Sequence, residues 1–311
     1  MSIFLKELAT FYAKKQQVLV DALTEEAPLL ASMPLSPSTH GLYHVYEKLA
    51  AITPGDYTAI DAARTAVNLT TNLENVTLSI IAGILEQGKD SAQQLGGFDA
   101  VIRKKLPKIL KKTGENVEND IIYNSFRSYA EDNSKLVSGG GSASANYTML
   151  AITWTEGEME GVFDKNIQAS TEAMFFELTR MSNGGLYKNS SNLPVFGLDF
   201  TGILGVMMAN PRYIAGIVNC DITNDDPVGT RTFPTIAQID QMLVDARANS
   251  STRIYCHPNV KNYLGATYKS GQVRYAPRAA EGVNDIVPAW NDVEIVPSYN
   301  FTAGSEATVS L

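Results

Sequence analysis

Cys256 and His257 are the first residues to consider for chemistry, because a thiol beside an imidazole is the pairing of a cysteine hydrolase. Neighbouring residues on a strand point to opposite faces, so these two side chains cannot easily hydrogen-bond each other. The base would then have to be His40 or His44, the other two histidines of the chain. A hydrolase that uses Cys256 stays an alternative, but a buried structural thiol is the expected role.

The segment 83–90, Gly-Ile-Leu-Glu-Gln-Gly-Lys-Asp, nearly matches a phosphate-binding loop. Asp90 stands where that motif has the hydroxyl that binds Mg²⁺, and its charge repels phosphate. Glu156 and Glu158 resemble an acid–base pair, yet such neighbours arise by chance among 33 acidic residues. Three histidines and two cysteines form no ligand cluster. We therefore predict no catalytic residues, no metal site and no cofactor, and a protein that is not an enzyme.

The charge of the chain limits its partners. A formal net charge of −8 makes the chain as a whole repel nucleic acid and anionic membranes, so contact with a polyanion needs a local patch. Such a patch could face packaged nucleic acid, acidic groups on a neighbouring subunit, or only solvent. The sequence contains one candidate, made of Arg103, Lys104, Lys108, Lys111 and Lys112.

Nothing in the sequence indicates export or insertion into a membrane. The first 15 residues carry Glu7 within their apolar stretch and no small-residue cleavage site. The apolar runs 76–85 and 202–209 are too short to span a bilayer. Cys220 and Cys256 lie 36 positions apart in apolar contexts, which fits buried thiols of a reducing compartment.

Residues 97–132 have the pattern of one long helix with an apolar stripe. At 1.5 Å per residue it would be about 50 Å long, longer than one compact domain needs, and it would suit a spine across a flat molecule that meets copies of itself. The alternative is two helices broken at Pro107 or Gly114. The stripe consists of Ile102, Leu106, Ile109, Leu110, Val117 and Ile121.

The segments before this helix look like parts that need a partner. Residues 3–23 predict an amphipathic helix, and the prolines of 28–37 predict an extended strap that cannot form a core. Residues 40–86 predict two long strands joined by a mobile tip near 50–64, and a lone hairpin of that size is marginal in water. The apolar face of the first helix includes Leu5, Leu8, Tyr12 and Leu19.

The remainder predicts a mixed lobe of strands and helices. The glycines of 138–142 predict a flexible joint, and 268–286 predicts a long functional loop. Strands are expected at 147–155, 175–179, 195–200, 213–218, 253–257, 293–296 and 307–311, and helices at 236–246 and 258–264.

The order of these parts resembles the major capsid proteins of tailed bacteriophages, whose Hong Kong-type fold is shared with encapsulins. The resemblance covers residues 1 to about 300, and no single motif is diagnostic. It implies an α+β phage capsid fold with an arm, an extended hairpin loop, a spine helix, and peripheral and axial domains. The stretches that carry it are EEAPLLASMPLSPSTHGLYHVYEKL, FDAVIRKKLPKILKKTGENVENDIIYNSF, PRYIAGIVNCD and IDQMLVDARANSSTRIYCHPNVKNYL.

The resemblance also implies a division of the chain. Apolar and hydrogen-bonding surface left over by one subunit would be covered by the next. The hairpin tip has no lysine between positions 49 and 88, so the lysine–asparagine crosslink of some family members is not expected. The parts would be an arm at 1–39, an extended loop at 40–88, a peripheral domain at 89–200, an axial domain at 201–290, and closing strands at 291–311.

By this resemblance the function is structural: many copies, as pentamers and hexamers, would build the icosahedral head around the double-stranded DNA genome of a tailed phage. The expected partners are portal and scaffolding proteins, with a decoration protein as a further option, and DNA on the inner surface. The protein would be part of the virion and would assemble in the host bacterial cytoplasm. The nearest rival is an encapsulin-like compartment around a cargo enzyme.

Overall fold

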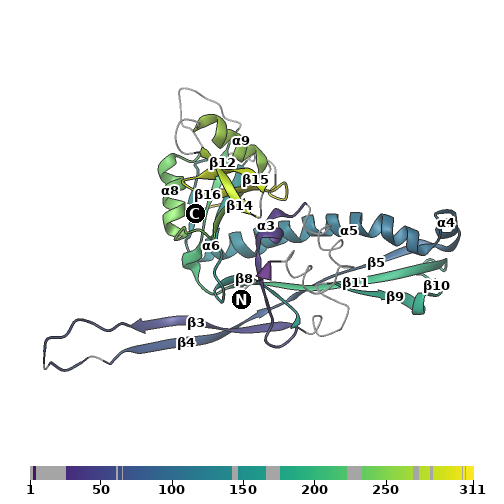
Figure 1. The fold of residues 1–311 in the computed structure, drawn as a ribbon, viewed down its shortest axis with the longest axis horizontal. Coiled ribbons are helices and arrows are strands. Elements are labelled where there is room, and N and C mark those ends of the chain that lie inside the picture. Colours follow the sequence, from purple (N-terminus) through teal and green to yellow (C-terminus); the bar gives the residue numbers. More distant parts are fainter. Residues whose placement is uncertain are drawn as a thin grey trace.

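The computed structural model describes most of the chain and shows an elongated α+β molecule with two sheets, a long helical run and a projecting hairpin (Figure 1). Element labels follow that figure. The described residues are 3–4, 26–60, 62–64, 66–141, 146–165, 176–222, 233–268, 273–280, 283–302, 304 and 306–311.

Each of the two larger sheets has seven strands among the described residues. The first contains β1 (Ile3–Phe4), β2 (Pro34–Pro37), β5 (Ser79–Gly88), β8 (Met159–Phe163), β9 (Phe176–Arg180), β10 (Tyr187–Lys188) and β11 (Pro194–Met208). The second contains β6 (Leu136–Ser138), β7 (Asn146–Thr153), β12 (Ile214–Asp221), β13 (Thr252–Cys256), β14 (Val273–Ala280), β15 (Val283–Trp290) and β16 (Val293–Pro297).

The long helical run predicted at 97–132 is confirmed. It consists of α5 (Phe98–Asp120), a π-helical segment η1 (Ile121–Arg127) and α6 (Ser128–Asp132) without a gap, so the alternative of two broken helices is wrong. Pro107 lies inside α5 and Gly114 on its buried side. The predicted stripe faces the core, with Leu106, Leu110 and Ile121 buried and Ile102, Ile109 and Val117 packed against the same cluster.

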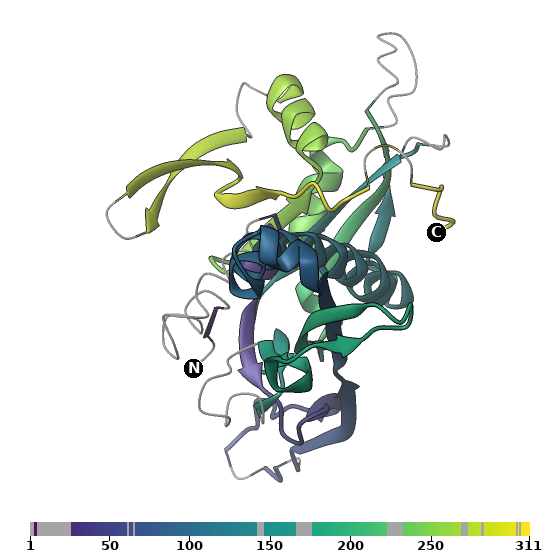
Figure 2. The same cartoon turned by 90° about the vertical axis from the view of Figure 1, so that its right-hand side faces the viewer.

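The helical run lies between the two sheets (Figure 2) and shares one core with both of them. From the first sheet Leu198 and Phe200 join this core, and from the second sheet Leu150 and Ile152 do so. Apolar burial on two sides stabilises the helix even though Pro107 removes a backbone donor and helix propensity alone would be weak. The run therefore fixes where the two sheets stand relative to each other.

In the first sheet the central strand is β11, which pairs with β5 along ten residues. Odd-numbered β5 residues point to the helix, and Leu85 is buried there. A Cβ at Gly83 would lie 2.6 Å from the ring of Phe200, so only glycine lets this ring pack against β5. The boundary that we predicted at 200/201 falls inside β11, which continues through it unbroken.

The second sheet places β7 between β12 and β13. The helices α8 (Ile236–Asp245) and α9 (Pro258–Thr267) pack on this sheet through a second apolar cluster. A capping box between Thr235 and Gln238 begins α8, and Pro258 begins α9. The strands predicted at 147–155, 213–218, 253–257 and 293–296 and both helices are confirmed, each within a few residues.

The predicted arm and strap differ from the structure. Ile3–Phe4 form strand β1 against β2, so a helix that starts at residue 3 is wrong, and 5–25 lies outside the described residues. The strap forms a short helix, α3 (Pro28–Ser32), followed by β2, which pairs with β8. Leu29 and Leu30 are buried in the main core. The prolines prevented a long helix but allowed one helical turn and a short strand between β1 and β8.

Three further expectations were wrong. The loop predicted at 268–286 contains the hairpin β14–β15 (Figure 2), because β14 is an edge strand and an edge tolerates proline. Residues 307–311 form no strand, and only Glu306 makes an isolated bridge. Within the predicted joint, Gly139 and Gly141 donate backbone hydrogen bonds to β12, so the described part of it is held in place.

Candidate functional site

The hairpin of β3 (Tyr43–Thr53) and β4 (Asn68–Thr77) projects from the body of the molecule (Figure 1). It forms a sheet of two strands, and no third strand pairs with it among the described residues. Leu69 and Leu73 on β4 are 61% and 73% exposed. Two strands with exposed leucines are at the limit of independent stability in water. The hairpin therefore presents surface that its own described chain leaves open.

The base of this hairpin is fixed to the body. Leu78, directly after β4, is buried in a small cluster with Val162, Ile203 and Met207. A Cβ at Gly205 would lie 2.5 Å from Leu78 Cδ2, so this glycine allows the hairpin base to approach β11 closely. The extended loop predicted at 40–88 thus divides: residues 43–77 project, and β5 joins the first sheet.

Polar side chains link the two strands of the hairpin near its base. Tyr46 and Glu74 stand opposite each other in the register, and the Tyr46 hydroxyl donates to Glu74 Oε2 at 3.0 Å. Lys48 Nζ lies 3.2 Å from Glu74 Oε1. Burial and the Glu74 carboxylate raise the pKa of Tyr46. The tyrosine therefore stays a hydrogen-bond donor over the whole physiological range.

The outer face of β5, opposite the helix, carries exposed apolar side chains. Ile80 and Ile84 are 59% and 56% exposed, and their cross-strand neighbours on β11 are Ile203 and Asp199. We call this the outer sheet face: the even-numbered β5 residues with their β11 partners. Next to it, a cleft of about 430 Å³ lies among β5, β11 and the start of η1. Ile80 and Ile84 thus leave apolar surface open to water on this face.

The predicted basic patch lies on α5, and the structure separates its members. Arg103, Lys104 and Lys108 are exposed on the helix. Lys111 Nζ lies 2.6 Å from Glu26 Oε1 and Lys112 Nζ 2.5 Å from Glu115 Oε2, so these two charges are largely used within the chain. The exposed charge is therefore concentrated in the first half of the helix. The predicted arm-interface residues Leu5, Leu8, Tyr12 and Leu19 lie outside the described residues.

Glu118 is a residue that our sequence reasoning missed. Its carboxylate is fully buried on α5 and accepts from the backbone amides of Leu29 and Leu30 at 2.9 and 3.1 Å. It also accepts from the Ser298 hydroxyl and, at 3.1 Å, from Asn300 Nδ2. Burial raises the pKa of Glu118, and these hydrogen bonds oppose the shift. The sequence signal was an acidic residue eight positions after Leu110, on the apolar stripe.

The two thiols are buried and free, as predicted. Burial raises the pKa of Cys256 to about 12, so almost none of it is thiolate at neutral pH. His257 Nδ1 accepts from the Asn259 amide at 3.1 Å and caps α9. A deeply buried neutral thiol beside a capping histidine is not an arrangement that activates a nucleophile.

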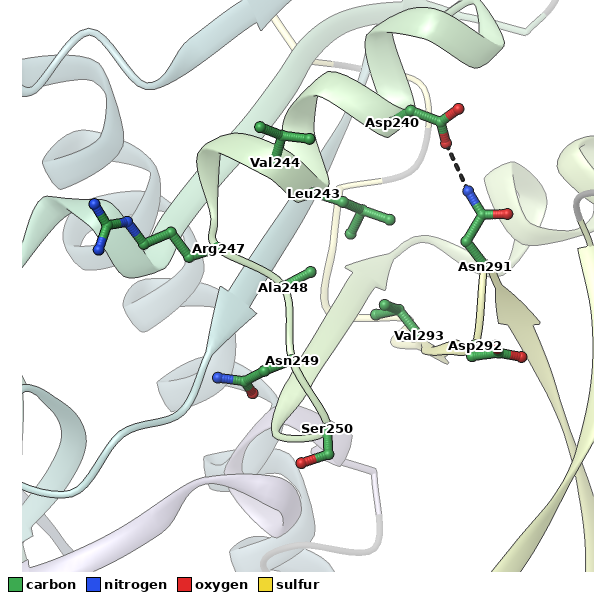
Figure 3. A pocket seen from close by; sticks show the side chains of 10 residues that line it. All are labelled: Asp240, Leu243, Val244, Arg247, Ala248, Asn249, Ser250, Asn291, Asp292 and Val293. Atoms are coloured by element: carbon green, nitrogen blue, oxygen red, sulfur yellow. Dashed lines mark hydrogen bonds between the residues drawn. The ribbon is translucent and has the colours of Figure 1, made fainter.

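A hollow lies on the second sheet, between the end of α8 and the β15–β16 turn (Figure 3). It is an open depression of about 750 Å³, where Asn291 Nδ2 donates to Asp240 Oδ1 at 2.9 Å. Its lining contains no histidine, cysteine or lysine. The lining residues are Asp240, Leu243, Val244, Arg247, Ala248, Asn249, Ser250, Asn291, Asp292 and Val293.

The remaining chemical motifs lead to no site in the structure. The segment 83–90 is not a loop: it continues β5 directly into α4 (Lys89–Gln94). Among the described residues, no group of three or more His, Cys, Asp or Glu side chains is placed to hold a metal ion. In the same part of the chain, no helix has the length and apolar character needed to cross a membrane.

Comparison with known proteins gives a family and a fold. The family model of the major capsid protein GP7 matches residues 121–303, more than half of the chain. A chain of the bacteriophage Epsilon15 structure is similar with TM-score 0.52 and 15% identity, over 88% of each chain. A chain of the bacteriophage JBD30 capsid is similar with TM-score 0.52 and 9% identity, over 86% of this chain and 88% of the other. No curated protein sequence matches.

Proposed function

The chain belongs to the family of the major capsid protein GP7, and from this we propose how its copies meet in a shell. Its role is structural: many copies form a capsid, and the protein is part of the virion. This fulfils the expectation drawn from the order of parts, and neither the compartment nor the hydrolase alternative gains support. One observation carries the proposal: a hairpin without a third strand and an uncovered sheet face occur in the same described part of the chain.

In the proposal, the hairpin β3–β4 of one copy lies on the outer sheet face of its neighbour. Leu69 and Leu73 of the first would contact Ile80 and Ile84 of the second. Each of these side chains is more than half exposed in one chain, so covering it contributes roughly 1 kcal/mol. The gain at one contact is small, but a closed shell repeats it at every subunit.

The test replaces both isoleucines, as Ile80→Ser with Ile84→Ser, and follows particle formation by negative-stain microscopy and sedimentation. We expect soluble folded subunits that form few shells or none. The matched control is Val244→Ser, which removes an apolar side chain of 68% exposure on α8. Normal shells from the double variant would contradict the proposed contact.

The roles of the parts follow from this contact. Residues 43–77 would be the extended loop, the first sheet with α5 the peripheral domain, and the second sheet the axial domain. Subunits would form the pentamers and hexamers of an icosahedral head, with portal and scaffolding proteins and, as a further option, a decoration protein. Assembly would take place in the host bacterial cytoplasm, a reducing compartment in which free thiols are common.

For the arm we propose that Leu5, Leu8, Tyr12 and Leu19 bind a neighbouring subunit. The support is the amphipathic pattern of the sequence. Replacing all four with Ser leaves the described core residues unchanged, so we expect soluble subunits that no longer form shells. Normal particles seen by negative-stain microscopy would remove the arm from the assembly mechanism.

For the genome we propose that Arg103, Lys104 and Lys108 face packaged double-stranded DNA on the inner surface. Removing one cation that binds a phosphate should reduce the slope of log affinity against log salt by about 0.9. We expect the triple change to Ala to lower this slope by about 2 to 3. Lys112→Ala is the control, because Lys112 already pairs with Glu115. An unchanged slope in the triple variant would refute DNA contact, and absence of nuclease-protected DNA in particles would favour the encapsulin-like alternative.

A further inference from the structure

The described residues that follow β16, namely 298–302, 304 and 306–311, contact the helical run, β7 and β12; we call them the C-terminal strap, which is distinct from the proline-containing strap of residues 28–37. The Phe301 side chain is fully buried and packs edge-on against the Tyr123 ring, 6.5 Å between centroids. Asn119 Nδ2 donates to the Asn300 carbonyl at 2.6 Å, and the Thr302 amide donates to the Tyr123 hydroxyl at 2.8 Å. The first part of the strap is thus fixed to α5 and η1.

Glu306 forms the next attachment. Its carboxylate is buried and accepts hydrogen bonds from the Tyr123 hydroxyl of η1 and from the Thr148 hydroxyl of β7. Arg127 Nη1 lies 3.5 Å from the same carboxylate, and its guanidinium covers the Tyr123 ring at 4.6 Å. One side chain of the strap therefore contacts both the π-helical segment and the second sheet.

Asn219 of β12 forms the last attachment. Its amide Nδ2 donates to the Val309 carbonyl at 2.8 Å, and its Oδ1 accepts from the Val309 amide at 2.8 Å. This two-way pairing imitates one step of a β-ladder at the point where β12 has a bulge. Asn219 adopts a positive φ of 58°, a conformation that asparagine tolerates better than most residues. The side chain is almost fully buried, so its hydrogen bonds are shielded from water.

Together these contacts join the helical run to the second sheet. In the chain, α6 and β6 are joined by residues 133–135, and the apolar core shared by the helical run and the second sheet already packs the two together. The C-terminal strap adds polar contacts to this packing, from η1 to β7 and then to β12. Buried, fully paired polar groups of this kind favour one geometry strongly, because any other leaves donors or acceptors unpaired.

We propose that Glu306 and Asn219 are positioning residues for assembly. Acting through the strap, they fix the angle between the helical run and the second sheet, and so fix the curvature with which neighbouring copies meet. The claim about the angle concerns the single subunit alone. The claim about curvature rests on the proposed function, because it requires that copies assemble.

The first experiment uses the full-length protein before assembly and measures backbone hydrogen exchange at 121–127 and 214–221. Glu306→Ala and Asn219→Gly should each speed exchange there by about tenfold or more, since each leaves buried groups unpaired. Asn219→Gly keeps the positive φ and removes the pairing with Val309, together with a 3.2 Å hydrogen bond from Asn219 Nδ2 to Ser138 Oγ on β6. Glu306→Gln should restore most of the protection. The controls Glu131→Ala on α6 and Asn291→Gly, also at positive φ, should change exchange by less than about twofold.

The second experiment measures the diameters of particles formed by the same variants. We expect a broader diameter distribution for Glu306→Ala and Asn219→Gly than for the natural chain. Ile295→Val, a core change outside the strap, should lower yield and keep the diameter uniform, which separates positioning from stability. Unchanged exchange in both strap variants would overturn the proposed strap, whether or not shells form. Faster exchange with uniform particles would overturn the link to curvature, and absence of shells from the natural chain would refute the proposed function instead.

Discussion

The projecting hairpin and the helical run differ in how far their apolar and hydrogen-bonding groups are covered by the rest of the described chain. On the hairpin, β3 and β4 pair only with each other among the described residues, and leucines of β4 face water. In the helical run, even a carboxylate is buried, and four donors from two segments satisfy it. The difference shows that one chain contains a body with a large buried core and a hairpin whose described surface stays open, which by our proposal a neighbouring copy covers. Substitutions in the two regions should therefore differ in their effect on the folding of single subunits.

Glu118→Ala should have the largest effect on the body. It removes one acceptor and leaves the buried amides of Leu29 and Leu30, with two side-chain donors, unpaired. Several unpaired donors at about 1–3 kcal/mol each predict a decrease of at least about 3 kcal/mol in the free energy of unfolding. Urea unfolding of unassembled protein measures it. Glu115→Ala, on the same helix but paired only with exposed Lys112, should cost less than about 0.5 kcal/mol. Equal stability of the two variants would contradict this account of the body.

Gly83→Val tests the packing between β5 and the core. The new Cβ would meet the Phe200 ring at 2.6 Å, so the ring must move and the free energy of unfolding should fall by about 1–3 kcal/mol. Gly88→Ala is the control, because a Cβ there meets nothing within 4 Å. Thermal unfolding measures both. A Gly83 variant as stable as the control would show that β5 is as loosely packed as the hairpin.

The pH dependence of the free energy of unfolding tests the burial of the Glu118 carboxyl without removing the side chain. Burial raises the folded-state pKa of Glu118 above the unfolded value of about 4.3. The folded protein therefore binds this proton more tightly than the unfolded chain does, and stability rises as the pH falls through the folded pKa. As the pH falls from 7 toward the unfolded value of about 4.3, we expect the natural chain to gain stability relative to Glu118→Gln, measured by urea unfolding at each pH. A relative decrease on acidification would contradict the assigned direction.

On the outer sheet face the expected effect on folding is the smallest. Ile80 and Ile84 are more than half exposed, so their change to Ser should alter the free energy of unfolding of single subunits by less than about 0.5 kcal/mol. The same double variant should fail in assembly. A large decrease in subunit stability would show that this face already belongs to the body.

Sequence patterns predicted the elements that carry a regular repeat. The stripe from Ile102 to Ile121 predicted the helical run, and short strand-like apolar runs bounded by turn residues predicted β7, β12 and β13. These signals come from residues that are close in the chain. They were enough for the α+β class and, with the order of parts, for the capsid family.

The contacts between distant segments were not predictable in this way. Residues 28–35 suggested a strap because prolines exclude a long helix, yet Leu29 and Leu30 are core residues held by Glu118, almost 90 positions later. The role of Asn219 depends on a bulge in β12 and on residue 309. Such pairings form only when segments far apart in the chain come together in the fold. The sequence near each residue gives no signal of them, apart from the acidic residue on the apolar stripe.

Hydrogen exchange of β3 and β4, residues 43–53 and 68–77, before and after assembly tests the central claim most directly. We predict rapid exchange in dilute subunits and strong protection in shells, while β7 and β12 are protected in both states. Hairpin amides that are equally well protected in dilute subunits would show that the hairpin is already complete, and would contradict the claim that it gains its stability from a neighbouring copy.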